Sequence, residues 1–229
     1  FKDGVIVKNL LYRSFTSVDV ARLFSLYPIK NSIVSSVANI EPAVVNALHR
    51  LSKHFILFDH LTPLPIDNRY QTPETLGHDR IASAVGASYL SPNTNLLIVD
   101  AGSAITYDFV SAEQGFLGGN IAPGMKMRLT ALNQMTKKLP LVEVEENAFR
   151  PLFGKNTREA IAVGVVRGIV FEVKGYMRSL KDQKTSFTTY ITGGHAPYIL
   201  DAMKRQEVIG EPHLVLIGLN RILEYNTNN

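Results

Sequence analysis

An acidic residue at the end of a hydrophobic run is the feature with the clearest chemical meaning. Residues 96–100 read Leu-Leu-Ile-Val-Asp and lead into the small-residue turn Ala101-Gly102-Ser103. Glycine and alanine let the backbone approach an anion, the turn N–H groups point outward, and Ser103 adds a hydroxyl. Asp100 is placed to hold a cation beside that anion. The alternative is an ordinary hairpin with an aspartate in its turn, because short glycine motifs often occur without a ligand.

Two glycine pairs lie where a strand is expected to give way to a helix: Gly118-Gly119 and Gly193-Gly194. Unpaired N–H groups and the helix dipole at such a junction attract phosphate. The second pair also leaves room for a flat ligand such as a nucleobase. The alternatives are close packing of strand and helix for the first pair and a tight turn for the second.

A third candidate is Gly77-His78-Asp79-Arg80, where a long loop meets a helix. Asp79 next to a cation is a candidate general base whose orientation Arg80 and the helix terminus would fix. Aspartate is also a common N-cap, so a capping role is the alternative. His78 is expected at the surface, and the six histidines show no metal-ligand spacing such as HxxxH. The absence of cysteine excludes disulfides, thiol nucleophiles and cysteine-ligated zinc.

The elements that must position these residues alternate between strand and helix, which predicts an α/β layered fold. Three successive strands joined by tight turns predict a meander in the second half. Asn156 and Glu159, three residues apart, predict a capped start for the longest helix. The expected strands span 5–7, 33–37, 54–58, 96–100, 104–110, 116–121, 188–192 and 213–217. The expected helices span 18–26, 42–51, 79–89, 125–136 and 157–180, with one more on each side of 213–217.

The polar stretch 91–94 predicts a boundary between domains 1–92 and 93–229, with a hinge near 88–95. The second half has three strands before its first helix, whereas the first half has one. If the halves are duplicates, about two strands are expected to precede residue 1. Gly164 and Gly168 lie four apart on an otherwise apolar helix, which indicates close helix packing in a subunit interface or in the core.

Composition excludes several classes of protein. The 229 residues are 45% hydrophobic, and the net charge is +4. No run of basic residues indicates a nucleic-acid track. No apolar stretch is long enough to span a bilayer, and the start has no signal-peptide core. We therefore expect a cytoplasmic protein that binds neither nucleic acid nor membrane.

In combination these motifs are specific. Five segments, in this order along the chain, closely resemble type III pantothenate kinase. They are 67–70 (DNRY), 72–80 (TPETLGHDR), the 100–108 turn, 118–124 and 154–157 (GKNT). The resemblance covers essentially the whole chain. It implies the acetate kinase, sugar kinase, Hsp70 and actin superfamily, in which two duplicated ribonuclease-H-like domains hold ATP in the cleft between them.

The resemblance also implies roles for individual residues. Asp79 corresponds to the proton acceptor and Asp100 to the ligand of a monovalent cation, potassium or ammonium. Ser103 stands where the family usually has a threonine that contacts ATP. The other implied pantothenate contacts are Tyr70, Gly77, His78, Arg80 and Thr157. The other implied ATP contacts are Gly102, Gly119, Gly193 and Gly194.

The implied reaction is phosphorylation of pantothenate by ATP and Mg²⁺ in coenzyme A biosynthesis, by a homodimer. Asp79 would accept the proton of the attacking hydroxyl, and the protein would otherwise position groups and stabilise charge. The family's first phosphate loop, Asp-x-Gly-Asn-Thr, is absent from this sequence and is expected on the preceding strands. The chain as written is therefore expected to be a poor kinase. Two alternatives stay open: a kinase of another small alcohol, and a nucleotide-binding regulatory protein without turnover.

Overall fold

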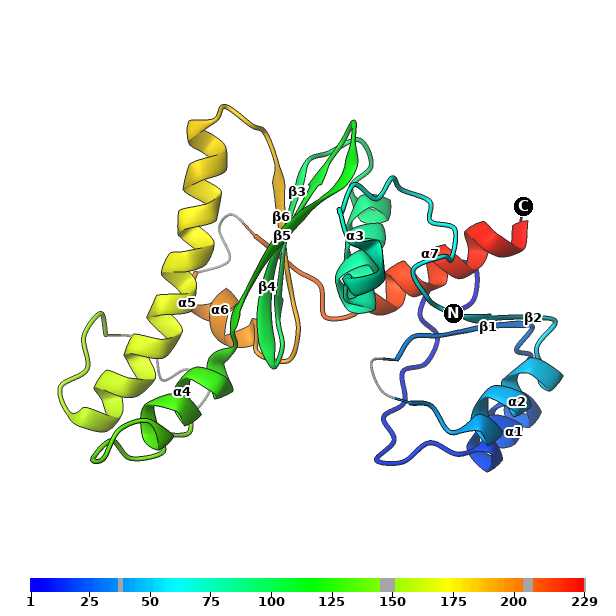
Figure 1. The fold of residues 1–229 in the computed structure, drawn as a ribbon, viewed down its shortest axis with the longest axis horizontal. Helices are drawn as coiled ribbons and strands as arrows, with labels where there is room; N and C mark the ends of the chain where they lie inside the picture. The colour runs from blue at the N-terminus through cyan, green and yellow to red at the C-terminus, as the bar shows by residue number, and fades with distance from the viewer. Residues whose placement is uncertain (37–38, 145–150, 204–207, 229) are drawn as a thin grey trace.

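The computed structural model describes residues 1–36, 39–144, 151–203 and 208–228 and has a mixed α/β fold (Figure 1). The helices are α1 (Ser17–Leu26), α2 (Pro42–Leu51), α3 (His78–Leu90), α4 (Met125–Gln134), α5 (Thr157–Asp182), α6 (Ala196–Ala202) and α7 (Leu214–Asn228). The strands are β1 (Asn31–Val34), β2 (His54–Leu57), β3 (Leu96–Ala101), β4 (Ala104–Ser111), β5 (Gly115–Pro123), β6 (Thr188–Thr192) and β7 (Ile209–Gly210).

A five-stranded sheet in the order β5-β4-β3-β6-β7 forms the centre of the molecule. The predicted meander is confirmed, because β3 pairs antiparallel with β4 and β4 antiparallel with β5. On its other side β3 pairs parallel with β6. Residues 96–99 of β3 are all buried, as expected for an apolar strand at the centre of a sheet that is covered on both faces.

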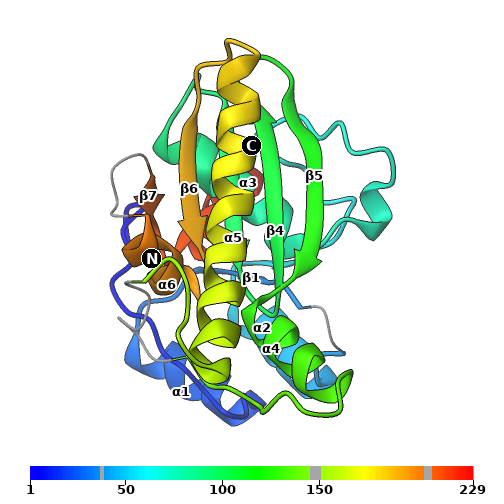
Figure 2. The same cartoon turned by 90° about the vertical axis from the view of Figure 1, so that its left-hand side faces the viewer.

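Helices cover the two faces of this sheet. In Figures 1 and 2, α5 runs along one face and α3, with α7 beside it, lies against the other. Each face has its own apolar core. Val166, Ile169 and Val173 of α5 belong to one core, and Ile81 and Val85 of α3 belong to the other.

The long helix α5 begins as its sequence predicts. The Asn156 side chain accepts a hydrogen bond from the Glu159 N–H at 3.0 Å. Glu159 in turn accepts from the Lys155 N–H at 2.9 Å. These bonds satisfy donors that the first helical turn leaves free, so the cap fixes where α5 starts.

The N-terminal part is a smaller layer in which α1 and α2 pack beside a parallel pair of strands, β1 and β2 (Figure 1). Val20 and Val44 lie at the centre of its small core. The predicted strand 33–37 is observed as Asn31–Val34, and Val37 lies outside the described residues. The predicted strand at 5–7 is wrong, because only an isolated bridge joins Lys2 to Val5.

The predicted strand at 213–217 is also wrong, because α7 begins at Leu214. A short apolar run does not by itself distinguish a strand from a buried helix. Tertiary packing decides here: a Cβ on Gly86 or Gly218 would collide with the main chain of the facing helix. The two glycines thus let α3 and α7 cross in close contact, which a strand in place of α7 could not do.

No helix in the described part of the chain is both long enough and apolar enough to cross a membrane.

Candidate functional site

A buried ion pair joins the start of α3 to the middle of β4. The Arg80 guanidinium donates to the Asp108 carboxylate, with Nε–Oδ1 at 3.0 Å and Nε–Oδ2 at 3.2 Å. A third bond runs from Nη2 to Oδ1 at 2.5 Å. The two side chains are 5% and 1% exposed. Because an unpaired buried charge is very unfavourable, this pairing fixes both side chains.

Two aromatic rings enclose the Arg80 guanidinium. Its central carbon lies 5.4 Å from the ring centre of Tyr70 and 5.9 Å from that of Phe116. Tyr70 is held there because the long loop docks on β5: the Arg69 N–H bonds to the Phe116 carbonyl, and the Phe116 N–H bonds to the Asp67 carbonyl, both at 2.9 Å. The loop thus delivers one implied pantothenate contact, Tyr70, to a second, Arg80.

Asp79 lies in the first turn of α3, immediately before Arg80. The N-cap position belongs to Gly77, so the capping alternative for Asp79 is wrong. The Asp79 carboxylate accepts a hydrogen bond from the Arg80 N–H at 2.9 Å and is otherwise exposed. A carboxylate at this place is favoured by the helix dipole and is free to contact a substrate. His78, next to it, stacks on the buried ring of Phe58 at 5.0 Å.

Asp100, the next-to-last residue of β3, has two glycines beside its carboxylate. A Cβ on Gly102 would lie 3.5 Å from the Asp100 Oδ1, and one on Gly193 would collide with the same oxygen. Gly193 also has a φ of +90°, which L-residues with side chains rarely adopt. The glycines therefore leave space beside the Asp100 carboxylate that a side chain would fill.

The electrostatic environment of Asp100 is unfavourable for its own charge. Burial, followed by the negative charges of Asp79 and Asp108, raises the pKa of Asp100 to about 6. No basic side chain offsets these effects on Asp100, whereas Arg80 opposes them for Asp108. A half-buried carboxylate with this balance is suited to bind a cation.

The structure brings two of the predicted ATP turns together. The His195 N–H, just after Gly194, donates to the Ala101 carbonyl at 2.9 Å. His195 Nδ1 also lies 3.3 Å from the Gly102 carbonyl oxygen. Ser103 is exposed at the same turn, and a Cβ on Gly194 would meet nothing within 4 Å. The turns at 102–103 and 193–194 thus form one edge with open space beside it.

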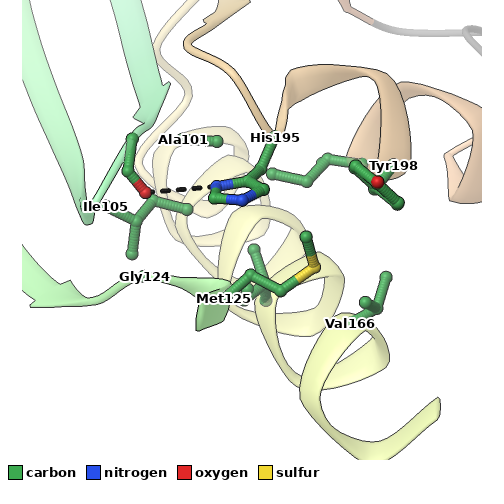
Figure 3. Close-up of a pocket in the computed structure, with 10 residues that line it drawn as sticks. Ala101, Ile105, Gly124, Met125, Val166, His195 and Tyr198 are labelled. Carbon is green, nitrogen blue, oxygen red and sulfur yellow. Dashed lines mark hydrogen bonds between the residues drawn. The ribbon is translucent and has the colours of Figure 1, made fainter. Parts of the chain in front are cut away.

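A small apolar cavity lies behind this edge (Figure 3). The ring of His195 lies between the Ala101 side of the cavity and Tyr198, with Met125 below it. His195 belongs to none of the motifs predicted from the sequence. The signal for it is its position directly after Gly194, because a residue there must face the neighbouring turn.

Gly119 has a packing role that the sequence did not reveal. It pairs across the strands with Asp108, and a Cβ at this position would collide with the Asp108 carboxylate. Glycine is therefore needed here to leave space for the ion pair, whether or not ATP also contacts it. The neighbouring Gly118 lies beside the ring of Tyr70.

Thr157 is the predicted contact that lies apart from the others. It is the first residue of α5 and lines an open groove between α4 and α5. Asp79 is instead carried by α3, on the opposite face of the sheet (Figure 2). Within one chain, Thr157 and Asp79 therefore do not form a common site.

A second polar network ties α4 and α5 to β4. Arg128 donates to Glu172 at 2.6 and 2.7 Å, and the Tyr107 hydroxyl donates to Glu172 at 2.6 Å. Burial acts to raise the pKa of Glu172, but these hydrogen bonds outweigh it and hold the pKa below its usual value. Tyr107 and Asp108 are neighbours on β4, so this strand is anchored through one face to α5 and through the other to α3.

In the described part of the chain, no group of three or more His, Cys, Asp or Glu side chains is arranged to hold a metal ion. Asp100 contributes a half-buried carboxylate beside the glycine turns. This arrangement fits a cation that is held jointly by one carboxylate and by a bound phosphate.

A family model described as type III pantothenate kinase matches residues 13–179. Among curated proteins, a type III pantothenate kinase from Phocaeicola vulgatus is 42% identical over 204 residues, which are 89% of this chain and 83% of that protein. One from Bacteroides fragilis is 39% identical over 225 residues, covering 98% of this chain and 91% of that protein.

Among solved structures, a crystal structure from Campylobacter jejuni has a similar fold, with a TM-score of 0.57 and 25% identity. The match covers 91% of this chain and 89% of that one. That protein is described as a conserved member of the Baf family of transcriptional activators.

Proposed function

The chain belongs to the type III pantothenate kinase family, and we propose how its residues carry out the reaction. The reaction is the ATP-dependent phosphorylation of pantothenate in coenzyme A biosynthesis. The observation that carries the assignment is the placement of Asp79. Its carboxylate is exposed, yet it is fixed through the Arg80 N–H to a buried ion pair.

In this proposal Asp79 accepts the proton of the pantothenate hydroxyl as the oxygen attacks the γ-phosphorus of ATP. Phosphoryl transfer needs an oriented nucleophile and stabilised charge more than covalent chemistry. Tyr70, Gly77 and His78 line the acceptor side around Asp79. The test is the Asp79→Asn variant described in the Discussion.

The two joined turns bind ATP in this proposal. Gly102 and Ser103 offer N–H groups and a hydroxyl to the phosphates, and Gly193 and Gly194 leave room on the adenosine side. Gly119 contributes mainly by its lack of a side chain beside Asp108. ATP brings a divalent metal, here Mg²⁺, which would neutralise part of the phosphate charge.

Asp100 binds a monovalent cation in this proposal, and potassium or ammonium is expected to stimulate turnover. The groups that shift the pKa of Asp100 are carboxylates and include no basic side chain, so a weakly hydrated cation can offset the repulsion between Asp100 and bound phosphate. Initial rates in potassium, ammonium and sodium chloride at equal ionic strength test this. Equal rates in all three salts would refute the cation site.

The finer fold assignment is also a proposal: an actin-like arrangement of domains 1–92 and 93–229 with the nucleotide between them. It is supported by the separate N-terminal layer of α1, α2, β1 and β2, which has its own small core beside the five-stranded sheet. The location in the cytoplasm stays a prediction from the sequence.

We infer a homodimer that associates through the outer face of α5. Ala160, Gly164 and Phe171 are exposed on this face, and Phe171 is 54% exposed. A Cβ on Gly164 would meet nothing within 4 Å, so this glycine has no packing role inside one chain. In such a dimer Thr157 completes the acceptor site of the partner subunit, which explains its separation from Asp79.

The Gly164→Arg variant tests the dimer. An arginine fits the isolated helix at least as well as glycine does, so the free chain should keep its thermal stability. Its bulk would hold a second α5 away, and sedimentation at micromolar concentration should show a shift toward monomer. Ser25→Arg, on the exposed side of α1, is the control. A Gly164→Arg protein that sediments as wild type would exclude this interface.

A further inference from the structure

We propose that Asp108 is a positioning residue of the phosphoryl transfer, which acts by holding Arg80 and thereby the turn of α3 that carries Asp79. The inference rests on the proposed role of Asp79 as the proton acceptor. It assigns a function to the last residue of the 100–108 motif, a carboxylate to which the family resemblance gave no role.

The hydrogen bonds of the Asp108 carboxylate are all directed to Arg80 in the contacts described above. Both carboxylate oxygens accept bonds from the guanidinium, and Asp108 is 1% exposed. A carboxylate so enclosed has no face left for a substrate or for a cation. On the Arg80 side, Nε and Nη2 are committed to Asp108.

The main-chain N–H of Arg80 links the buried ion pair to the Asp79 carboxylate. The Arg80 N–H lies 2.9 Å from the Asp79 Oδ1 and 3.1 Å from the Gly77 carbonyl oxygen. One amide therefore fixes both the helix start and the carboxylate orientation. A shift of Arg80 moves Asp79 with it.

The anchor itself is rigid. Asp108 lies on β4, between Ile98 of β3 and Gly119 of β5. The rings of Tyr70 and Phe116, whose centres lie 5.4 and 5.9 Å from the central carbon of the guanidinium, restrict its movement. Support of this kind is what a catalytic group needs to keep a productive geometry.

The test measures kcat and the KM for ATP in Asp108→Asn, in Asp79→Asn and in the double variant. Asp108→Asn keeps size but removes the charge, and kcat should fall about tenfold to a hundredfold, since small misplacements have effects of this size. The KM for ATP should stay close to wild type. In the Asp79→Asn background the same change should lower kcat no further, because Asp108 acts through Asp79.

Arg80→Lys is the second variant, chosen because it keeps a cation beside Asp108 and is expected to fold. Lysine keeps the charge but lacks the forked geometry of arginine, so the thermal midpoint should fall somewhat and kcat should fall in the protein that remains folded. Glu113→Gln, which removes a carboxylate at an exposed position in the turn between β4 and β5, is the control and should have wild-type kcat.

The outcomes separate the two proposals. A wild-type kcat in folded Arg80→Lys would overturn the positioning role of Asp108. So would a double variant Asp79→Asn/Asp108→Asn whose kcat falls by the product of the two single losses. Wild-type kcat in Asp79→Asn would instead overturn the role of Asp79 on which it rests. A higher KM for ATP with unchanged kcat in Asp108→Asn would assign Asp108 to nucleotide binding. This result would also contradict the inference.

Discussion

Asp79→Asn is expected to lower kcat by at least about a hundredfold while leaving ATP binding near wild type. Asparagine keeps the size and the bond from the Arg80 N–H, but it cannot accept a proton from the pantothenate hydroxyl. General-base catalysis contributes about 10²- to 10⁴-fold, so the loss should appear in kcat. ATP should bind normally, because Asp79 belongs to the acceptor side of the site.

Stability provides the internal control for this variant. Gly77 is the N-cap of α3, so Asp79→Asn removes only a favourable charge in the first turn, worth about 0.3–1 kcal/mol. Glu74→Gln also replaces a carboxylate by an amide, at an exposed position in the loop before α3. This control should leave kcat unchanged. A loss of thermal stability with normal turnover would make Asp79 a structural residue and send the search for the base elsewhere.

Asp100→Asn is expected to stabilise the protein without added potassium at pH 8 while it abolishes the potassium dependence of turnover. Burial and the charges of Asp79 and Asp108 raise the pKa of Asp100 to about 6, above the ordinary 3.8. The folded state therefore binds this proton more tightly than the unfolded state does. The contribution of Asp100 to the free energy of unfolding therefore falls by up to about 3 kcal/mol as pH rises from about 4 through about 6.

Asparagine carries no charge, so the variant should lack this loss and unfold at a higher temperature than wild type at pH 8. At pH 4.5, where the wild-type carboxyl is largely protonated, the two proteins should differ much less. Potassium should stabilise wild type at pH 8 and leave Asp100→Asn unaffected, because a ligand stabilises only the state that binds it. A variant less stable than wild type at pH 8 would contradict this account of Asp100.

Much of the site could be predicted from the sequence because its parts are local motifs. Asp100 at the end of an apolar strand and the glycines at 102 and 193 each follow from short-range patterns, and the structure brings them together. The order of the motifs, and not any one of them, pointed to the family that the comparisons confirm.

The Arg80–Asp108 pair could not be predicted in this way. It joins a helix start to a strand 28 residues later, and sequence spacing says nothing of such a tertiary contact. The available signal was a charged residue within the otherwise apolar strand 104–110, because a charge there needs a buried partner. The error at 213–217 has the same origin, since the contact with α3 through Gly86 and Gly218 decides between helix and strand.

Pantothenate kinase activity can be measured by incubating the protein with ATP, Mg²⁺, potassium and pantothenate and following the phosphorylated product by mass spectrometry. We expect ATP-dependent formation of phosphopantothenate, with far slower transfer to other small alcohols and a loss of product in Asp79→Asn. A regulatory nucleotide-binding protein would bind ATP and form no product, and a kinase of another alcohol would prefer a different acceptor. Either result, obtained with protein that binds ATP, would contradict the assignment.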